Sequence, residues 1–158
     1  MSPRHALAAA LIVLSQSALV SAPHAPEVQA RRDQVFSALL RYILQRDAKY
    51  FHGPLFVQFN ELGEDYASNN LMLARLQPDF PRIRPMSRTS SRAPFYDRIT
   101  HEKGIQLSVQ EFEFPSSTRA RVHVRITADD LVGSSSECTL RCIRHHWRVT
   151  HEKLCGIS

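Results

Sequence analysis

The sequence lacks internal repeats, low-complexity tracts and the common zinc-binding cysteine patterns. The absence of repeats argues against solenoid and propeller architectures, which are built from self-similar units. The 3 cysteines have no Cys-x-x-Cys spacing, which argues against the usual zinc frameworks. No cysteine stands directly after the apolar run at residues 6–20, so a lipid-anchored form is not indicated. The sequence therefore predicts an ordinary globular protein.

Residues 1–25 show the pattern of a secretory signal peptide. Arg4 gives a short basic start, residues 6–20 are largely apolar, and small residues follow. A membrane anchor would need a longer run, and residues 15–17 interrupt this one with Ser-Gln-Ser. We therefore predict export to the periplasm or the exterior, with the cleavage point left open. Residues 26–158 are expected to form a single domain, because they are too few for two.

The strongest helical pattern covers residues 27–46. Its apolar residues recur at three- and four-residue spacings and form one stripe, which predicts an amphipathic helix. The stripe consists of Val28, Val35, Phe36, Leu39, Leu40, Ile43 and Leu44. Weak alternation at residues 55–59 predicts a short strand, and residues 65–76 predict a second, shorter helix. The apolar residues assigned to this second helix are Leu71, Leu73 and Leu76.

Residues 105–158 predict an antiparallel meander, because apolar residues recur there with a period of two. Between residues 119 and 126, apolar side chains alternate with basic ones, so this strand has an apolar face and a basic face. The apolar face is expected to pack against the predicted helix at residues 27–46.

One of the predicted strands needs an irregularity. Ile105 and Leu107 share one parity, whereas Phe112 and Phe114 share the other. A bulge near residues 108–109 would place all four side chains on the apolar face.

The last two strands are expected to form a hairpin. Residues 129–136, with a glycine and three serines, predict the loop before it. Arg144 and His145 predict its two-residue turn, although this pair lacks the usual Asn-Gly or Asp-Gly signal. The opposite pairs in that register are Cys142 with Trp147, Arg141 with Arg148, and Leu140 with Val149.

The order of these elements resembles the cystatin-like, nuclear-transport-factor-2-like α+β roll. The resemblance rests on residues 35–40, 105–108 with Phe112, 120–124 and 147–149. The chain looks like small exported bacterial proteins of this superfold, whose function is mostly undescribed. It departs from them around the last hairpin, where they often carry a Gly-rich turn and an Asp-Gly pair. The resemblance implies a long N-terminal helix packed on a curved antiparallel sheet, with a pocket at the open end of the cone.

Some members of this superfold are small enzymes with a His-Asp pair in that pocket, so a lyase, isomerase or hydrolase is the alternative function. His151 shares the parity of Trp147 and Val149 and is therefore predicted to face inward. Asp97 and Tyr66 are predicted to line the same mouth. A histidine that donates to a backbone carbonyl explains the pattern better, because nothing fixes its second partner.

Residues 77–94 form the most basic linear stretch of the domain. Their four prolines argue against a long helix or a central strand, so an irregular loop is predicted. The loop is either a solvated surface or an arm for phosphate, nucleic acid or an anionic surface. Its arginines are Arg82, Arg84, Arg88 and Arg92, and no aromatic residue is interleaved among them.

The basic face of the meander is a second candidate surface. Its arginines are Arg119, Arg121, Arg125, Arg141 and Arg148. Glu111 and Glu113 on the preceding strand are expected to neutralise some of them, and the remainder would suit an acidic partner. The formal net charge of +5 favours anionic partners but does not decide between these surfaces.

Cys138, Cys142 and Cys155 would meet an oxidising compartment after export, which predicts one disulfide and one free thiol. Cys138 and Cys142 would lie about 13 Å apart along one strand, which is too far for a bridge. Either cysteine could instead meet Cys155 on the neighbouring strand if a bulge shifts the register, and of these two disulfides we favour Cys138 with Cys155. A zinc or copper site with His145 and His146 is disfavoured, because these histidines lie far from Cys155 on the hairpin.

These patterns predict an exported, non-enzymatic binding or interaction protein that uses the basic sheet face or the arginine-rich loop. Its partner is expected to be another protein or an anionic surface rather than a specific nucleic acid. A small ligand in the pocket of the cone stays open. No metal or other cofactor is predicted.

Overall fold

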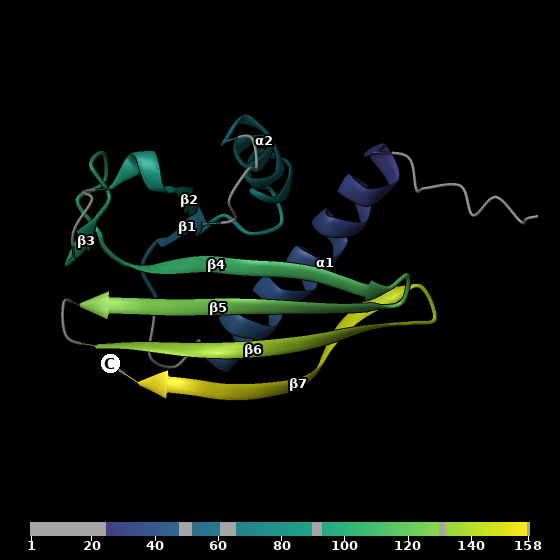
Figure 1. Ribbon diagram of the computed structural model, residues 1–158. Coiled ribbons are helices and arrows are strands. Elements are labelled where there is room, and N and C mark those ends of the chain that lie inside the picture. The colour runs from purple at the N-terminus through teal and green to yellow at the C-terminus, as the bar shows by residue number, and fades with distance from the viewer. Residues whose placement is uncertain (1–24, 48–51, 61–65, 90–92, 130–131, 158) are drawn as a thin grey trace, which may run out of the picture.

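A computed structural model describes residues 25–47, 52–60, 66–89, 93–129 and 132–157. The chain is α+β, with one long helix packed on an open, mixed, 7-stranded sheet (Figure 1). The predicted α+β class is therefore confirmed. The elements are α1 (Ala25–Arg46), β1 (Leu55–Phe59), α2 (Tyr66–Leu76), β2 (Ile83–Pro85), the 3₁₀ helix η1 (Met86–Arg88), β3 (Phe95–Tyr96), β4 (Lys103–Ser116), β5 (Arg119–Asp129), β6 (Val132–Ile143) and β7 (His146–Ile157).

The predicted signal peptide lies almost wholly outside the described residues. Only its last residue, Ala25, is described, and its backbone begins α1. Among the described residues, no helix combines the length and the apolar character that a membrane crossing requires.

The sheet has the strand order β2-β1-β4-β5-β6-β7, and β3 pairs with β4 beside this path. Strands β4 to β7 form the predicted antiparallel meander. However, β1 is parallel to both β2 and β4, so the prediction of a wholly antiparallel sheet is wrong. Parallel neighbours need a crossover connection, and the one between β1 and β2 contains α2.

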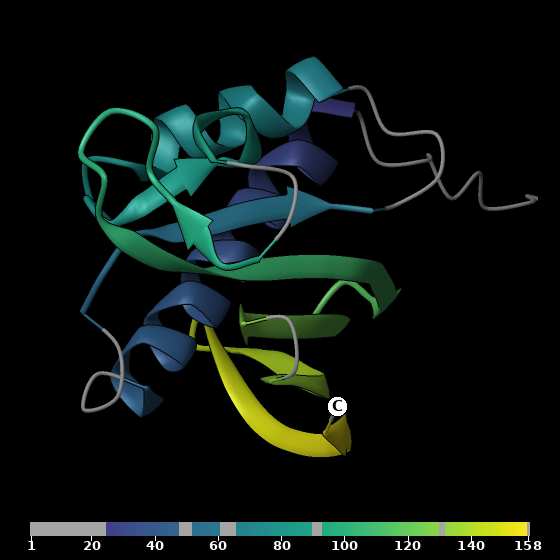
Figure 2. The same cartoon turned by 90° about the vertical axis from the view of Figure 1, so that its left-hand side faces the viewer.

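Helix α1 packs against the inner, apolar face of the meander, with its main contacts to β7 and β6 (Figure 2). Val35, Phe36, Leu39, Leu40 and Ile43 of the predicted stripe are buried in the core that this packing creates. The predicted amphipathic helix is therefore confirmed, and so is its packing partner.

Helix α2 forms where it was predicted, but it buries a different set of residues. Leu71 is 60% exposed, and Met72 is 1% exposed in its place. Met72, Leu73 and Leu76 lie at helical spacing on one side, so α2 presents these three residues to the core.

The predicted bulge in β4 is present, one residue later than expected. Val109 pairs with Val124 and Glu111 with His123, so Gln110 is the extra residue. The parity change lets Leu107, Phe112 and Phe114 all join the core.

The last hairpin has the predicted turn and the predicted register around it. Arg144 and His145 have φ values of 49° and 65°, which are the left-handed conformations of a type I′ turn. The three predicted opposite pairs all form.

Two predicted loops contain regular structure. Residues 133–136 belong to β6 and pair with β5, so the loop predicted at 129–136 is wrong over this part. Residues 83–88 form β2 and η1 within the predicted loop at 77–94. In both places, pairing with a neighbouring strand outweighs the weak strand preference of serine, glycine and proline.

Candidate functional site

The outer face of the meander, opposite to α1, carries a row of three arginines. Arg119 of β5 lies directly across from Arg141 of β6, which lies directly across from Arg148 of β7. Directly opposed residues in an antiparallel pair share one face of the sheet. All three side chains are exposed. We call Arg119, Arg141 and Arg148 the arginine row.

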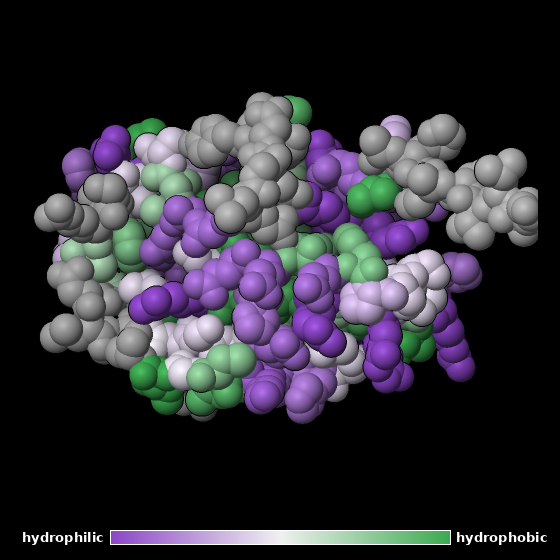
Figure 3. Space-filling view, viewed as in Figure 1, coloured by the Kyte–Doolittle hydropathy of each residue, from purple (hydrophilic) through white to green (hydrophobic). Residues whose placement is uncertain are grey.

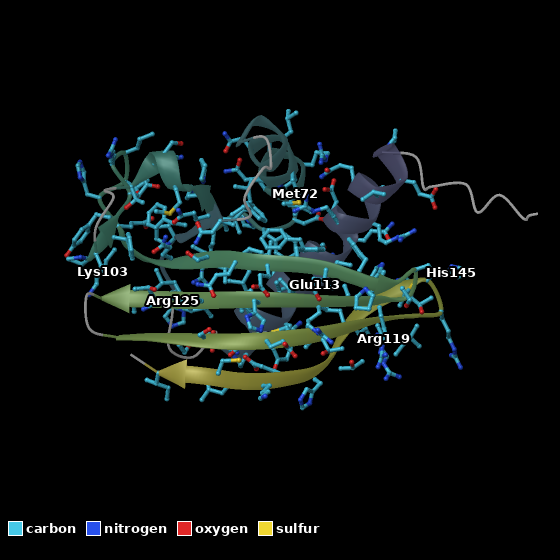
Figure 4. The ribbon with its side chains drawn as sticks, viewed as in Figure 1. Met72, Lys103, Glu113, Arg119, Arg125 and His145 are labelled. Atoms are coloured by element: carbon cyan, nitrogen blue, oxygen red, sulfur yellow. The ribbon has the colours of Figure 1, made fainter. Side chains whose placement is uncertain are left out.

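The row crosses the sheet near the turn that joins β6 and β7, and we call this part of the molecule the hairpin end. Figure 4 places Arg119 and His145 towards this end and Arg125 towards the other. The turn adds the exposed residues Arg144, His145 and His146. Figure 3 shows that hydrophilic side chains cover much of the outer face of the sheet.

The charge of the row is not neutralised within the described part of the chain. No acidic side chain there forms an ion pair with Arg119, Arg141 or Arg148. The row therefore concentrates three positive charges on neighbouring strands.

The adjacent part of the same face is neutralised instead. Arg121 Nη1 lies 3.5 Å from Glu113 Oε2, and Arg121 Nε lies 3.9 Å from Glu137 Oε1. His123 Nε2 lies 3.1 Å from Glu137 Oε2. Arg125 is exposed and also has an interaction partner. The pairing predicted for the basic face is thus found with Glu113, and Glu137 of β6 takes part as well.

A groove of about 560 Å³ lies beside the hairpin end, between α1 and β7. Arg41 lines it from the helix, and Arg148, His145 and His146 line it from the hairpin. Trp147, which is 9% exposed, contributes an aromatic wall. No aspartate or glutamate lines the groove among the described residues. Its charge therefore favours an anionic ligand.

The predicted arginine-rich loop surrounds a buried carboxylate. Asp97 is 0% exposed, and its Oδ1 accepts a 2.8 Å hydrogen bond from Arg88 Nη2. Its Oδ2 lies 3.6 Å from Arg84 Nε. The Oδ1 atom also accepts hydrogen bonds from the backbone N–H groups of Ile99 (2.8 Å) and Thr100 (3.2 Å).

These contacts keep Asp97 ionised. Burial alone would raise the pKa of its carboxyl, but the hydrogen bonds from Ile99, Arg88 and Thr100 outweigh burial and hold the pKa below its usual value. Two of the predicted loop arginines, Arg84 and Arg88, therefore have an internal partner.

Of the other two loop arginines, the structure describes only Arg82. Arg82 Nε donates a 2.9 Å hydrogen bond to the carbonyl of Gly53, and burial lowers the pKa of Arg82. Arg92 lies outside the described residues. Arg82, Arg84 and Arg88 therefore each have an internal contact, whereas a role of this segment in binding an anionic partner stays a prediction.

The predicted catalytic constellation does not assemble. His151 is exposed rather than inward-facing, because β7 has a bulge after Val149. Leu140 pairs with Val149 but Thr139 pairs with His151, so Thr150 is the extra residue and the parity reverses. The acid partner proposed for His151, Asp97, is held by the two loop arginines instead. The side chain of Tyr66 lies outside the described residues.

The same bulge turns Glu152 towards α1, a position that sequence reasoning missed. Tyr42 donates a 2.7 Å hydrogen bond to Glu152 Oε2, and Arg46 donates to Oε1. Burial acts to raise the pKa of Glu152, but hydrogen bonds from Tyr42, Arg46 and Ser136 hold it below its usual value. The hydrogen bond to Glu152 is the main cause that raises the pKa of Tyr42. These hydrogen bonds connect α1 to the edge strand β7.

The predicted disulfide is wrong, because all three cysteines are free. Cys138 pairs with Glu152 rather than with His151 or Cys155, since the bulge at Thr150 shifts the register by one residue. Cys138 is buried, which raises its pKa to about 12, whereas Cys155 is exposed. Within the described residues, no group of three or more His, Cys, Asp or Glu side chains is placed to hold a metal ion.

The functional candidates that remain are the arginine row and the adjoining groove. Comparisons of the chain with protein-family models, with curated proteins and with solved structures found no match.

Proposed function

We propose that this chain is an exported, non-enzymatic protein that binds an acidic partner protein through the arginine row. The observation that carries the proposal is the direct opposition of Arg119, Arg141 and Arg148 on three adjacent strands. All three are exposed, and none has a counter-charge among the residues that the structure describes. Export rests on the sequence pattern of residues 1–25.

The row has an energetic cost that binding would remove. Like charges directly opposed across a sheet destabilise it. A carboxylate-bearing partner would relieve this repulsion, and arginine forms bidentate hydrogen bonds with carboxylates. Arginine is also among the residues enriched at protein–protein interfaces.

The charges around the row favour a protein over a nucleic acid. Glu113 and Glu137 lie next to it on the same face, where they pair with Arg121. A nucleic acid presents a continuous line of phosphates, and the paired charges beside the row offer it little excess positive charge there. An acidic protein can place its charges on the row alone.

We also propose a more specific fold for this chain within the α+β class. A long helix on the concave side of a curved meander supports a roll of the cystatin-like, nuclear-transport-factor-2-like type (Figure 2). The parallel pairing of β1 with both β2 and β4 is the feature that an experimental structure should test first.

The binding proposal is tested by a pull-down from an envelope extract of the source organism at low salt. Three baits are compared: the wild type, the variant Arg141→Glu and the matched control Arg98→Glu. The control makes the same charge change at another exposed site. Proteins retained by the wild type and by the control should be lost with Arg141→Glu, and should elute as salt rises. Equal retention by both variants contradicts the proposal.

A further inference from the structure

Strand β7 has one free edge beside the groove. Among the described strands, β7 pairs only with β6. In a two-residue hairpin the residues that flank the turn, Ile143 and His146, exchange hydrogen bonds, and the pairs beyond them alternate. The N–H of Cys142 agrees with this alternation, because it donates to Thr118 rather than to Trp147.

The alternation fixes the direction of the backbone groups of β7. Trp147 and Val149 are opposite Cys142 and Leu140 in pairs that are not hydrogen bonded. Their N–H and C=O groups therefore point away from β6, towards the free edge. The strand keeps this pattern from His146 to Val149 and loses it at the Thr150 bulge, which leaves a straight edge of about 13 Å.

The groove has room for a strand at this edge. Trp147, Arg148 and Val149 line it from β7, and its volume of about 560 Å³ falls within the usual range of binding pockets. The opposite wall is α1, where Ser37 and Ala38 are small and leave space between helix and strand.

The charges of the residues that line the groove favour an acidic occupant. Arg41 is a cation on the helix wall, the outward-facing Arg148 is a cation on the strand that forms the other wall, and no acidic residue lines the groove among the described residues. A second copy of this chain would bring the same basic hairpin edge to a basic groove. A segment rich in Asp or Glu meets opposite charge instead.

We infer that the free edge of β7 from His146 to Val149 binds an extended acidic segment, which adds to the sheet as a further strand and lies in the groove against α1. The inference rests on the proposed function, because the segment belongs to the acidic partner protein. It differs from that proposal in requiring backbone hydrogen bonds to Trp147 and Val149.

The test measures amide hydrogen exchange by NMR on the full chain with and without a probe peptide. The probe is a blocked octapeptide of alternating Glu and Thr, and the matched control replaces each Glu with Lys. With saturating probe, the amides of Trp147 and Val149 should exchange about tenfold more slowly, which is the effect of an ordinary hydrogen bond. The amides of His146 and Arg148, already paired with β6, should change little, and the Lys peptide should change none.

A pair of variants tests the same hydrogen bond. Val149→Pro removes the edge N–H, whereas Val149→Ala trims the side chain and keeps that N–H; proline is tolerated on an edge where the N–H faces solvent. The Glu peptide should bind about tenfold more weakly to Val149→Pro than to Val149→Ala. The exchange measurement on the unmutated chain decides the matter if Val149→Pro does not fold.

Several results overturn the inference. They are binding of the Glu peptide without protection of Trp147 and Val149, protection that depends on protein concentration without peptide, equal effects of the Glu and Lys peptides, and no binding of the Glu peptide. The Arg141→Glu pull-down separately decides the proposed function, so loss of the strand contact alone leaves the arginine row standing.

Discussion

Two groups of arginines in this chain have opposite environments. Arg84 and Arg88 lie close together in sequence and share one counter-charge, Asp97, which is fully buried between them. The arginine row of Arg119, Arg141 and Arg148 is spread over three strands and has no acidic partner in the described part of the chain. Arg84 and Arg88 therefore have an internal counter-charge, whereas the row, which we propose meets a partner, has none among the described residues.

The difference shows that the density of arginine along a sequence does not predict which guanidinium groups have a counter-charge in the folded chain. Strand pairing and buried counter-charges decide which guanidinium groups remain free. A carboxylate nine residues away from Arg88 gives this loop arginine an internal partner, whereas cross-strand register brings together three arginines that no short segment contains.

The largest expected effect comes from removing the buried counter-charge. Asp97→Asn leaves Arg84 and Arg88 without their partner, and we expect the free energy of unfolding to fall by about 3 kcal/mol. Urea denaturation measures this change. Asp79→Asn, at an exposed aspartate, is the control and should alter stability by less than about 0.5 kcal/mol. A loss from Asp97→Asn no larger than the control's would show that Asp97 does not organise the loop.

The same contact predicts a dependence on pH. Because the pKa of Asp97 is lowered in the folded chain, its stabilising contribution is present above the unfolded-state pKa and is lost as pH falls through the folded-state pKa. The stability difference between the wild type and Asp97→Asn should therefore shrink on acidification. Denaturation curves of both proteins between neutral and strongly acidic pH measure it, and a difference that stays constant would contradict the assignment.

The smallest expected effect is a gain in the free energy of unfolding rather than a loss. Arg141→Thr removes the repulsion of Arg141 with both Arg119 and Arg148, so we expect a gain of about 0.5 kcal/mol in unfolding free energy. Arg121→Thr is the matched control, because Arg121 has Glu113 and Glu137 as partners, and it should produce no gain. Urea denaturation of the two variants measures both changes. If Arg141→Thr is the less stable of the two, the row is not under electrostatic strain.

The sequence predicted the elements and local registers well where a periodic pattern or a turn controls them. The apolar stripe of α1, the bulge near Val109 and the pairing of Cys142 with Trp147 all follow from short-range patterns. The parallel placement of β1 was missed because strand order depends on the path of the intervening segments. No short-range pattern encodes that path.

The candidate site was only partly predictable. All three arginines of the row were identified as outward-facing, and the pairing of Arg141 with Arg148 was predicted. The bulge at Thr150 was not, since it has no glycine or other local signal, and it reversed the expected directions of His151 and Glu152. The contact between Asp97 and Arg88 was missed because its two side chains meet only after the loop has folded back on β3 and β4.

The most direct test of the contrast between the two arginine groups is to neutralise one member of each and measure both properties. Arg88→Gln and Arg141→Gln make the same charge change, and each purified variant is examined by urea denaturation and by retention of the acidic partner protein under conditions where it is folded. We predict that Arg88→Gln lowers stability and retains the partner, whereas Arg141→Gln keeps or raises stability and loses the partner. Loss of the partner by Arg88→Gln, with retention by Arg141→Gln, would contradict the assignment of the arginine row as the binding surface.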